Sequence, residues 1–316
     1  MFTKIRRKIK QLGIPPELKH MRKLHPDFHL IKSGNAAGNF DIIWKKQRIG
    51  TTRPLASLPK ATQSACTIIA SGPSLAGIDL SQLKGRVCFG VNGSIVKSTE
   101  SDLPFTYFVV TDKNFARDRF ELVKQGIASG AYCLFGFRVL NEIAEREPSL
   151  LASDRLLLIQ ELNARYGIPK LSPVAFDDWA DGEADLLLSE TDRLKSGWVG
   201  FSKCVDKGVF TGQTVVYSAV QVACALGYKQ VYILGMDLGG TGSLARFYES
   251  GNTVASSRLD RDFDPYIVPS FQLARQICDA EGIALYNVSP HSRLSATILP
   301  KLSVDDMLAR FDQDYY

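Results

Sequence analysis

The sequence lacks any apolar stretch approaching the roughly 20 residues that a membrane-spanning helix requires. Its basic N-terminus is not followed by an apolar segment, as it would be in a secretory signal. We therefore expect a cytoplasmic protein that is soluble or attached to a membrane from outside. The six cysteines form no CxxC pair and have no local histidine partner, which argues against a disulfide framework and a zinc site. We expect no metal and no bound cofactor.

The glycine-rich loops of the common nucleotide-binding enzymes are also missing. The glycine turn after the first apolar strand has neither the GxGxxG fingerprint nor the lysine of a P-loop. This argues against dinucleotide oxidoreductases and against Walker-type ATPases. No nucleic-acid recognition motif accompanies the basic residues, so we expect no nucleic-acid partner.

What is present is an ordinary globular composition with an uneven charge distribution. The 316 residues are 45% hydrophobic and 22% charged, enough to build a sizeable core. Residues 1–60 contain 14 lysines and arginines against three acids, whereas the remainder holds 24 against 30. A basic segment therefore precedes a mildly acidic body, and this asymmetry points to an anionic partner.

Apolar residues recur at helical spacing within residues 1–12, and basic residues fill the other faces. A cationic amphipathic helix of this kind can lie in a lipid interface with its apolar side down. A helix docked on the body of the protein, with a solvated basic face, explains the pattern equally well. The sequence favours neither reading.

From residue 66 onward, short apolar runs alternate with helical patterns, which predicts a doubly wound, mostly parallel α/β sheet of Rossmann-like type. The predicted strands are Cys66–Ala70, Val87–Val91, Tyr107–Val110, Tyr132–Phe135, Val231–Leu234 and Ala284–Asn287. The predicted helices are Phe115–Gln125, Leu140–Glu147, Thr214–Leu226 and Val268–Glu281. We expect a basic N-terminal helical extension over 1–60 and a single nucleotide-binding domain over 61–316. The long Gly-, Ser- and Asp-rich stretch 238–266 is a candidate lid.

Polar residues and glycines follow these strands, at the edge where open parallel sheets bind ligands. They are Ser71, Gly72, Ser74, Asn92, Thr111, Asp112, Asp237, Ser289 and His291. Loops in general favour these residue types, so no single position indicates a site. Five strands that all end in polar residues or glycine together favour one. Gly72 permits close approach of a ligand, and we expect Ser74 to cap the next helix. A second turn, Thr211–Thr214, opens a nearly all-apolar helix; it is either a phosphate site or a helix cap alone.

Two of these runs resemble a known family. IIASGPSLAGIDLSQLKGRVCFGVNGS and FTGQTVVYSAVQVACALGYKQVYILGMDL are similar to the two motifs of bacterial CMP-sialic acid sialyltransferases. The same signatures resemble the lipopolysaccharide core enzymes that transfer 3-deoxy-D-manno-octulosonic acid (Kdo) from CMP-Kdo. They also recur in archaeal pterin pyrophosphokinases. The two runs cover about 55 residues, and they indicate a superfamily more strongly than a substrate.

The resemblance implies roles for individual residues in binding the donor nucleotide. The implied CMP-binding residues are Gly72, Pro73, Ser74, Asn92, Asp112, Thr211, Gly212, Gln213 and Tyr248. Asp112 stands where the family has an asparagine, and Tyr248 is the nearest match to the tyrosines that hold the phosphate of the leaving CMP. Tyr266 is a weaker match.

One departure concerns the base. The family's catalytic histidine lies in a Tyr-Ile-Gly-His-Ser-like segment, whereas Tyr266–Ser270 reads Tyr-Ile-Val-Pro-Ser. The missing histidine favours the Kdo branch over sialic acid transfer. We take His291 as the first candidate base, followed by Asp237 and Asp264.

The resulting expectation is an inverting, metal-independent glycosyltransferase. It would move Kdo, or less favourably sialic acid, from a CMP-sugar to an anionic lipopolysaccharide core acceptor. It would work as a peripheral protein at the inner membrane, touching lipid through residues 1–12. Homo-oligomers are compatible with the sequence. Two alternatives stay open: a Mg²⁺-dependent enzyme resembling pterin pyrophosphokinases, and a non-catalytic protein that binds a nucleotide or glycolipid.

Overall fold

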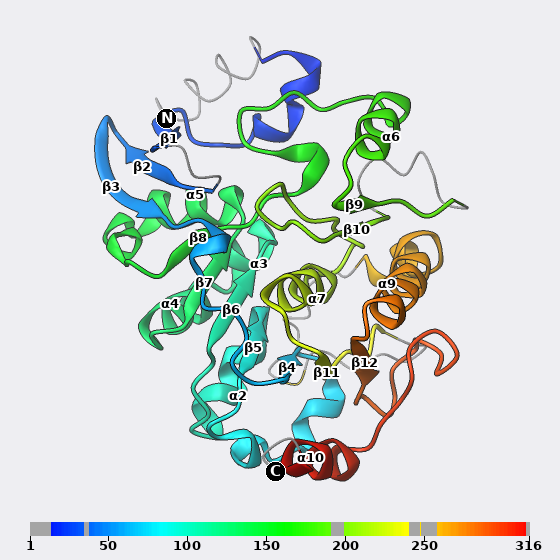
Figure 1. The fold of residues 1–316 in the computed structure, drawn as a ribbon. Helices are drawn as coiled ribbons and strands as arrows, with labels where there is room; N and C mark the ends of the chain where they lie inside the picture. Colours follow the sequence, from blue (N-terminus) through cyan, green and yellow to red (C-terminus); the bar gives the residue numbers. More distant parts are fainter. Residues whose placement is uncertain (1–13, 35–37, 191–198, 240–246, 248–257, 314–316) are drawn as a thin grey trace.

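A seven-stranded parallel sheet forms the centre of the molecule (Figure 1). The computed structural model describes residues 14–34, 38–190, 199–239, 247 and 258–313. The sheet order is β12-β11-β4-β5-β6-β7-β8. Its strands are β4 Ala65–Ile69, β5 Cys88–Val91, β6 Tyr107–Val110, β7 Tyr132–Phe135, β8 Leu156–Leu158, β11 Gln230–Leu234 and β12 Ala284–Asn287. The α/β fold and all six predicted strands are thereby confirmed.

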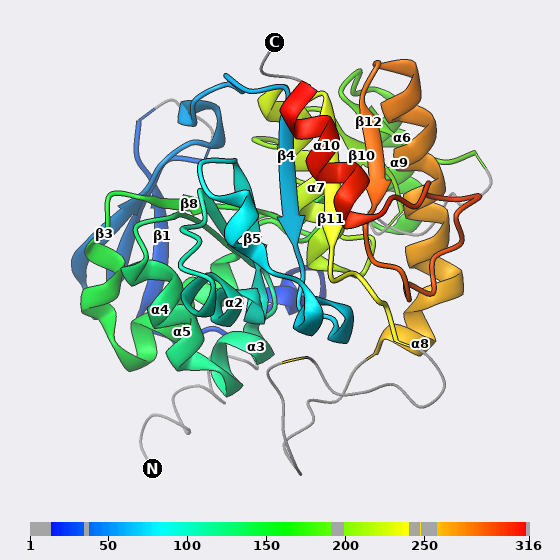
Figure 2. The ribbon, with the colours of Figure 1, turned by 90° about the horizontal axis from the view of Figure 1, so that it is seen from below.

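Helices cover both faces of this sheet, as Figure 2 shows from below. One face carries α7 Val215–Leu226 and α9 Val268–Ala280. The other carries α2 Ile95–Glu100, α3 Lys113–Asp118, α4 Phe120–Ala128, α5 Phe137–Arg146 and α10 Val304–Gln313. Alternate side chains of each strand enter one of two apolar clusters, because successive residues of a strand point to opposite faces. This explains why the strands read as continuous apolar runs.

The helices are close to their predicted positions, with one break. The pattern over Phe115–Gln125 predicts a single helix, but the chain leaves helical geometry at Arg119 and forms α3 and α4. Helix α7 is buried over most of its surface and ends at Gly227, whose φ of 99° is left-handed. That end is the predicted glycine cap, a position that favours glycine because it has no Cβ.

A second, three-stranded antiparallel sheet lies in the N-terminal region, where the sequence analysis predicts no strand. It comprises β1 Phe28–Lys32, β2 Phe40–Trp44 and β3 Gln47–Thr52. The β2–β3 hairpin turns at Lys45 and Lys46, with φ values of 48° and 68°. Such turns are usually marked by Asn-Gly or Asp-Gly, so two lysines give no sequence signal. Strand β8 was missed as well, because three leucines carry no β-specific pattern.

The remaining elements are short. Strands β9 Leu186–Leu187 and β10 Phe201–Ser202 form a two-stranded antiparallel sheet. The short helices are α6 Pro173–Asp181 and α8 Leu259–Asp262. Turns of 3₁₀ helix occupy Pro16–Met21, Leu55–Ser57, Pro73–Gly77, Leu80–Leu83, Asn92–Ser94, Pro148–Ala152 and Leu162–Ala164. Within the described residues, no helix is long and apolar enough to cross a membrane.

Candidate functional site

Strand order places the two sequence motifs side by side. The chain runs outward from β4 through β5, β6, β7 and β8, and it then returns to add β11 and β12 on the other side of β4. The order therefore reverses between β4 and β11, whose residues pair in parallel from Gln230 opposite Ala65 to Leu234 opposite Ile69. In open α/β sheets the ligand binds beyond the carboxyl ends of the strands at such a reversal.

The turn after β4 is docked against the end of β11. The Gly72 N–H donates to the Gly235 carbonyl at 2.8 Å, and the Ser74 N–H donates to Asp237 Oδ2 at 2.8 Å. A Cβ on Gly72 would lie 2.4 Å from that same carboxylate oxygen and 2.5 Å from the Gly235 oxygen. Only glycine therefore permits this approach. Ser74 does not act as the predicted helix cap, because Gly72 holds the N-cap position and Ser74 lies in the first turn.

The second glycine turn lies at the same edge of the sheet. Helix α7 leads into β11 and so runs antiparallel to the strands, which puts the turn before it at their carboxyl ends. A Cβ on Gly212 would lie 2.7 Å from the Tyr217 ring and 3.1 Å from Ser270 Oγ. The Gln213 side chain donates to Thr211 Oγ1 at 3.0 Å. This turn is thus fixed by close packing between α7 and the start of α9.

Unfavourable backbone conformations gather at this edge. Among the described residues, six non-glycine residues have positive φ, and three of them follow a strand of the seven-stranded sheet or precede α7: Asn92 at 49°, Gln213 at 55° and Leu238 at 61°. Non-glycine residues in the left-handed region are destabilised and persist where the surrounding structure enforces them, often at functional sites. Gly212 and Gly235 add φ values of 47° and 68° there.

Buried polar atoms without a partner lie in the same turns. Within the described residues, no hydrogen bond is made by Ser74 Oγ, Asn92 Oδ1, Asp237 Oδ1 or Ser270 Oγ. A buried polar atom without a hydrogen bond lowers the stability of the fold by about 1–3 kcal/mol, so such atoms are usually paired with a ligand or a water molecule. All four lie at the carboxyl edge of the sheet, where the docked glycine turn also lies. We call these four residues and Gly72 the switch-point cradle.

Replacing Asn92 by glycine tests whether the cradle binds ligand through this amide. Glycine accepts a φ of 49° without strain, so the free energy of unfolding should stay within about 1 kcal/mol of wild type. If the cradle binds the CMP that the resemblance implies, loss of the Oδ1 acceptor should weaken this binding about tenfold, since a hydrogen bond to a charged or polar ligand contributes roughly 1.5 kcal/mol or more. Thermal unfolding with and without CMP measures both. Lys46→Gly, at φ 68° in the remote β2–β3 turn, is the control and should leave CMP binding unchanged.

The three candidate bases occupy different environments. Asp237 is 8% exposed and belongs to the cradle. His291 is exposed in the turn after β12, and within the described residues it makes no hydrogen bond or ion pair. The Asp264 side chain is 81% exposed, and its carboxylate lies 3.9 Å from the Arg293 guanidinium. The structure therefore brings only Asp237 into contact with a motif residue.

Arg293 is a neighbour of the site that the sequence analysis did not single out. Its backbone N–H donates to the Asp237 carbonyl at 3.0 Å. Its guanidinium lies 3.9 Å from the centre of the Phe263 ring and pairs with Asp260 at 2.7 Å. This places a cation beside the end of β11. The available signal was an arginine shortly after a predicted strand, which is too common to stand out.

The segment Tyr266–Ser270, which the sequence analysis compares with the histidine motif of the sialyltransferases, also reaches the site. Residues Phe263–Ile267 form a π-helical turn that leads directly into α9, with Pro269 in the first turn of that helix. Single π-turns are rare and recur at functional sites. Ser270 is fully buried and faces Gly212.

Other predicted residues have structural roles or lie outside the description. Asp112 is exposed and caps α3, since its carboxylate accepts the Asn114 N–H at 2.8 Å. Ser289 Oγ accepts the Met236 N–H at 2.8 Å and so ties β12 to β11. Tyr248 and most of the candidate lid lie outside the described residues. Phe247 is described, and its N–H donates to the Ser71 carbonyl at 3.4 Å.

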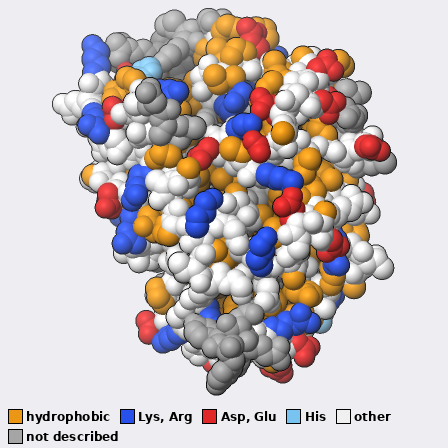
Figure 3. Space-filling model, viewed as in Figure 1, with side chains coloured by type: hydrophobic (Ala, Val, Ile, Leu, Met, Phe, Trp, Pro, Cys, Tyr) orange, Lys and Arg blue, Asp and Glu red, His pale blue; other side chains and the backbone are white. Residues whose placement is uncertain are grey.

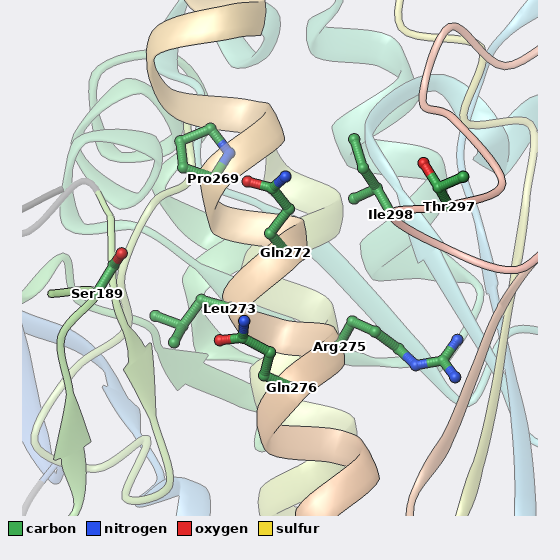
Figure 4. Close-up of a pocket in the computed structure, with 8 residues that line it drawn as sticks. All are labelled: Ser189, Pro269, Gln272, Leu273, Arg275, Gln276, Thr297 and Ile298. Atoms are coloured by element: carbon green, nitrogen blue, oxygen red, sulfur yellow. The ribbon is translucent and has the colours of Figure 1, made fainter. Parts of the chain in front are cut away.

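A separate cavity of about 360 Å³ lies against the outer face of α9, the face turned away from the switch-point cradle (Figure 4). It is lined by Ser189, Pro269, Gln272, Leu273, Arg275, Gln276, Thr297 and Ile298. Gln272 and Gln276 project from the outer face of α9, whereas Phe271 and Ala274 are buried on its inner face. The cavity is therefore distinct from the switch-point cradle. In the described part of the chain, no group of three or more His, Cys, Asp or Glu could hold a metal ion.

Comparison with known proteins gives a family match over most of the chain. The family described as 3-deoxy-D-manno-octulosonic acid transferase WaaZ matches residues 53–305. A probable 3-deoxy-manno-octulosonic acid transferase of Escherichia coli (strain K12) is 27% identical over 248 residues, which are 78% of this chain and 85% of the relative. A protein of the same description from Salmonella typhimurium is 26% identical over 82% of this chain and 93% of the relative.

Solved structures resemble the chain more remotely. The MAf glycosyltransferase of Magnetospirillum magneticum AMB-1 is 15% identical with a TM-score of 0.45. The match covers 81% of this chain but only 38% of that protein. The sialyltransferase CstII of Campylobacter jejuni, solved with a substrate analogue and cytidine-5′-monophosphate, is 16% identical with a TM-score of 0.37, over 75% of this chain and 84% of that one.

Proposed function

Because this chain belongs to the WaaZ family of 3-deoxy-D-manno-octulosonic acid transferases, we propose that it transfers Kdo from CMP-Kdo to a lipopolysaccharide core acceptor. Transfer of this sugar acid follows from the family. The CMP donor, the acceptor and the stereochemistry are the proposal. The observation that supports the CMP donor is the switch-point cradle, in which a glycine turn is docked on Asp237 and buried oxygens have no hydrogen-bond partner among the described residues.

The donor is proposed to bind with its CMP group in the cradle. Gly72 and Pro73 bring the backbone close to the nucleotide, while Ser74 and Asn92 supply hydrogen-bonding side chains whose oxygens are otherwise unpaired. The turn Thr211–Gln213 and the positive end of α7 lie at the same edge and favour negative charge. Residues 238–266 would act as a lid, with Phe247 touching the Ser71 turn.

The reaction is proposed to proceed with inversion at the anomeric carbon. The bond from that carbon to the CMP phosphate breaks as the acceptor hydroxyl attacks from the opposite side, and CMP leaves with the electron pair. Negative charge grows on the phosphate, where the hydroxyls of Ser74 and Ser270 and the positive end of α7 would stabilise it. The proton of the acceptor hydroxyl goes to a carboxylate base. We place Asp237 first for this role, because its Oδ1 is buried and unpaired, and we place His291 and Asp264 after it.

The acceptor is proposed to be the anionic core of lipopolysaccharide, which is anchored in a membrane. The excess of basic residues in 1–60 suits such a partner. Residues 1–12, which lie outside the described part of the chain, would contact lipid from the cytoplasmic side of the inner membrane. The protein would then act as a peripheral membrane enzyme.

Thermal unfolding with CMP, CTP and ATP, each with and without Mg²⁺, tests the donor assignment. CMP at 100 times its Kd should stabilise the protein by about 2.7 kcal/mol, with or without the metal. Transfer assays with CMP-Kdo and CMP-sialic acid would then identify the sugar. No response to CMP, together with Mg²⁺-dependent stabilisation by ATP, would contradict the proposal and favour the pyrophosphokinase. CMP binding without turnover on any acceptor would favour a binding protein.

A further inference from the structure

Exposed apolar side chains are concentrated in the loop before α6 and the first turn of that helix. Among the described residues, four large hydrophobic side chains are exposed, and three lie within seven positions: Ile168 at 46%, Leu171 at 39% and Val174 at 59%. All nine residues from 167 to 175 are exposed, and the run reads Gly-Ile-Pro-Lys-Leu-Ser-Pro-Val-Ala. Scattered single hydrophobic residues are normal on a surface, but a contiguous group indicates an interaction site.

This loop is held in place by the N-terminal 3₁₀ helix Pro16–Met21. The Lys170 N–H donates to the Glu17 carbonyl at 2.9 Å, and His20 Nε2 lies 2.9 Å from the Arg165 carbonyl. Figure 3 shows hydrophobic side chains along the top edge of the molecule, with acidic side chains among them. The apolar residues are therefore presented from a fixed loop. We call residues 15–23 and 165–175 together the apical face.

Basic side chains outnumber acidic ones on and beside the apical face. The basic residues are Lys19, Arg22, Lys23, Arg165 and Lys170, of which Arg22 and Arg165 are half-buried. The carboxylate within the face is Glu17, and the exposed Asp178 and Asp181 follow on α6. Apolar side chains framed by lysine and arginine match the surface of an anionic bilayer, where each basic residue contributes about 1 kcal/mol and the apolar groups enter the headgroup region.

Topology puts the apical face at the same edge of the sheet as the cradle. The loop follows β8, and all seven strands of the sheet are parallel, so its carboxyl end lies at the edge where β4 and β11 also end. Because neighbouring strands are about 4.8 Å apart, β8 is about 19 Å from β4 along the sheet. A bilayer contacting this face would hold a lipid-linked sugar chain within reach of the cradle.

We propose that the apical face docks on an anionic lipid surface through Ile168, Leu171 and Val174. This inference deepens the proposed function, since it specifies how the enzyme meets a membrane-anchored acceptor. It adds a contact to the one proposed for residues 1–12. The occupant is the bilayer itself; a second copy of the chain is the rival occupant.

The test is cosedimentation of the full-length protein with vesicles of phosphatidylcholine containing one-third phosphatidylglycerol. The triple variant Ile168→Glu, Leu171→Glu, Val174→Glu should lower the partition coefficient at least tenfold, because three apolar groups no longer enter the headgroup region. Ile31→Glu is the matched control, since Ile31 is 55% exposed but lies on β1. It should bind within about twofold of wild type. Vesicles of phosphatidylcholine alone should bind the wild-type protein more weakly.

Three results would overturn the proposal. The first is vesicle binding by the triple variant equal to wild type, which would leave residues 1–12 as the sole lipid contact. The second is a dimer by light scattering that the triple variant converts to monomer without any change in vesicle binding. The third is an equal loss in the Ile31→Glu control. CMP-induced stabilisation and hydrolysis of the donor in water should be the same in all variants. Failure of the donor assignment is thereby distinguished from failure of the docking.

Discussion

Replacing Asp237 by asparagine is expected to lower the rate of sugar transfer by about 10²- to 10⁴-fold, the usual contribution of a general base. Asparagine keeps the size of the side chain and an oxygen that can accept the Ser74 N–H, so the turn after β4 should stay docked. What it removes is the negative charge and the ability to take a proton from the acceptor. The measurement is kcat with saturating donor and acceptor, alongside the CMP-induced shift in Tm.

Asp237→Ala separates catalysis from support of the turn. Alanine leaves the Ser74 N–H without its partner, so this variant should lose CMP stabilisation as well as turnover. If Asp237→Asn transfers sugar at the wild-type rate, the carboxylate only positions the turn and the base lies elsewhere. His291→Gln and Asp264→Asn would then be examined in the same assay. Neither contacts the turn, so both should keep CMP binding.

Gly72→Ala is expected to destabilise the protein by about 1–3 kcal/mol and to abolish CMP-induced stabilisation. The added Cβ would lie 2.4 Å from Asp237 Oδ2 and 2.5 Å from the Gly235 carbonyl oxygen. The carboxylate is held by the Ser74 N–H, and the Gly235 backbone cannot move away without separating the turn after β4 from the end of β11. This contact positions both the turn after β4 and the end of β11. Thermal unfolding with and without CMP measures the two effects, and a Tm drop of about 2–4 °C per kcal/mol is expected for a chain of this size.

Gly77→Ala provides the matched control for this substitution. Gly77 belongs to the same 3₁₀ turn, but nothing lies within 4 Å of the position that its Cβ would occupy. Its replacement should leave Tm within about 1–2 °C of wild type and CMP binding unchanged. Equal effects of the two substitutions would show that the turn tolerates a Cβ at neither position. They would contradict a specific role for the contact between Gly72 and Asp237.

The two glycine-containing motifs show how far local sequence can predict a site. Gly72 and Asp237 were recognised because each follows an apolar strand, and the strands of a parallel sheet share a carboxyl edge. Their direct contact could not be predicted, since it joins residues 163 positions apart. Asp112 also follows an apolar strand and is predicted to bind ligand for the same reason. In the structure its carboxylate caps α3. Arg293 was not selected at all, although its backbone contacts Asp237.

The layers around the central sheet can be read from local sequence, because burial on both faces makes each central strand a continuous apolar run and each covering helix an apolar stripe. The polar residues at the strand ends can be read in the same way. That β11 lies beside β4, which creates the switch point, and that His291 is exposed whereas Asp237 is buried, follow from the packing of distant segments. The same packing decides that the apolar residues of the apical face point outward. Strand order and exposure depend on contacts between distant segments, and no local periodicity encodes them.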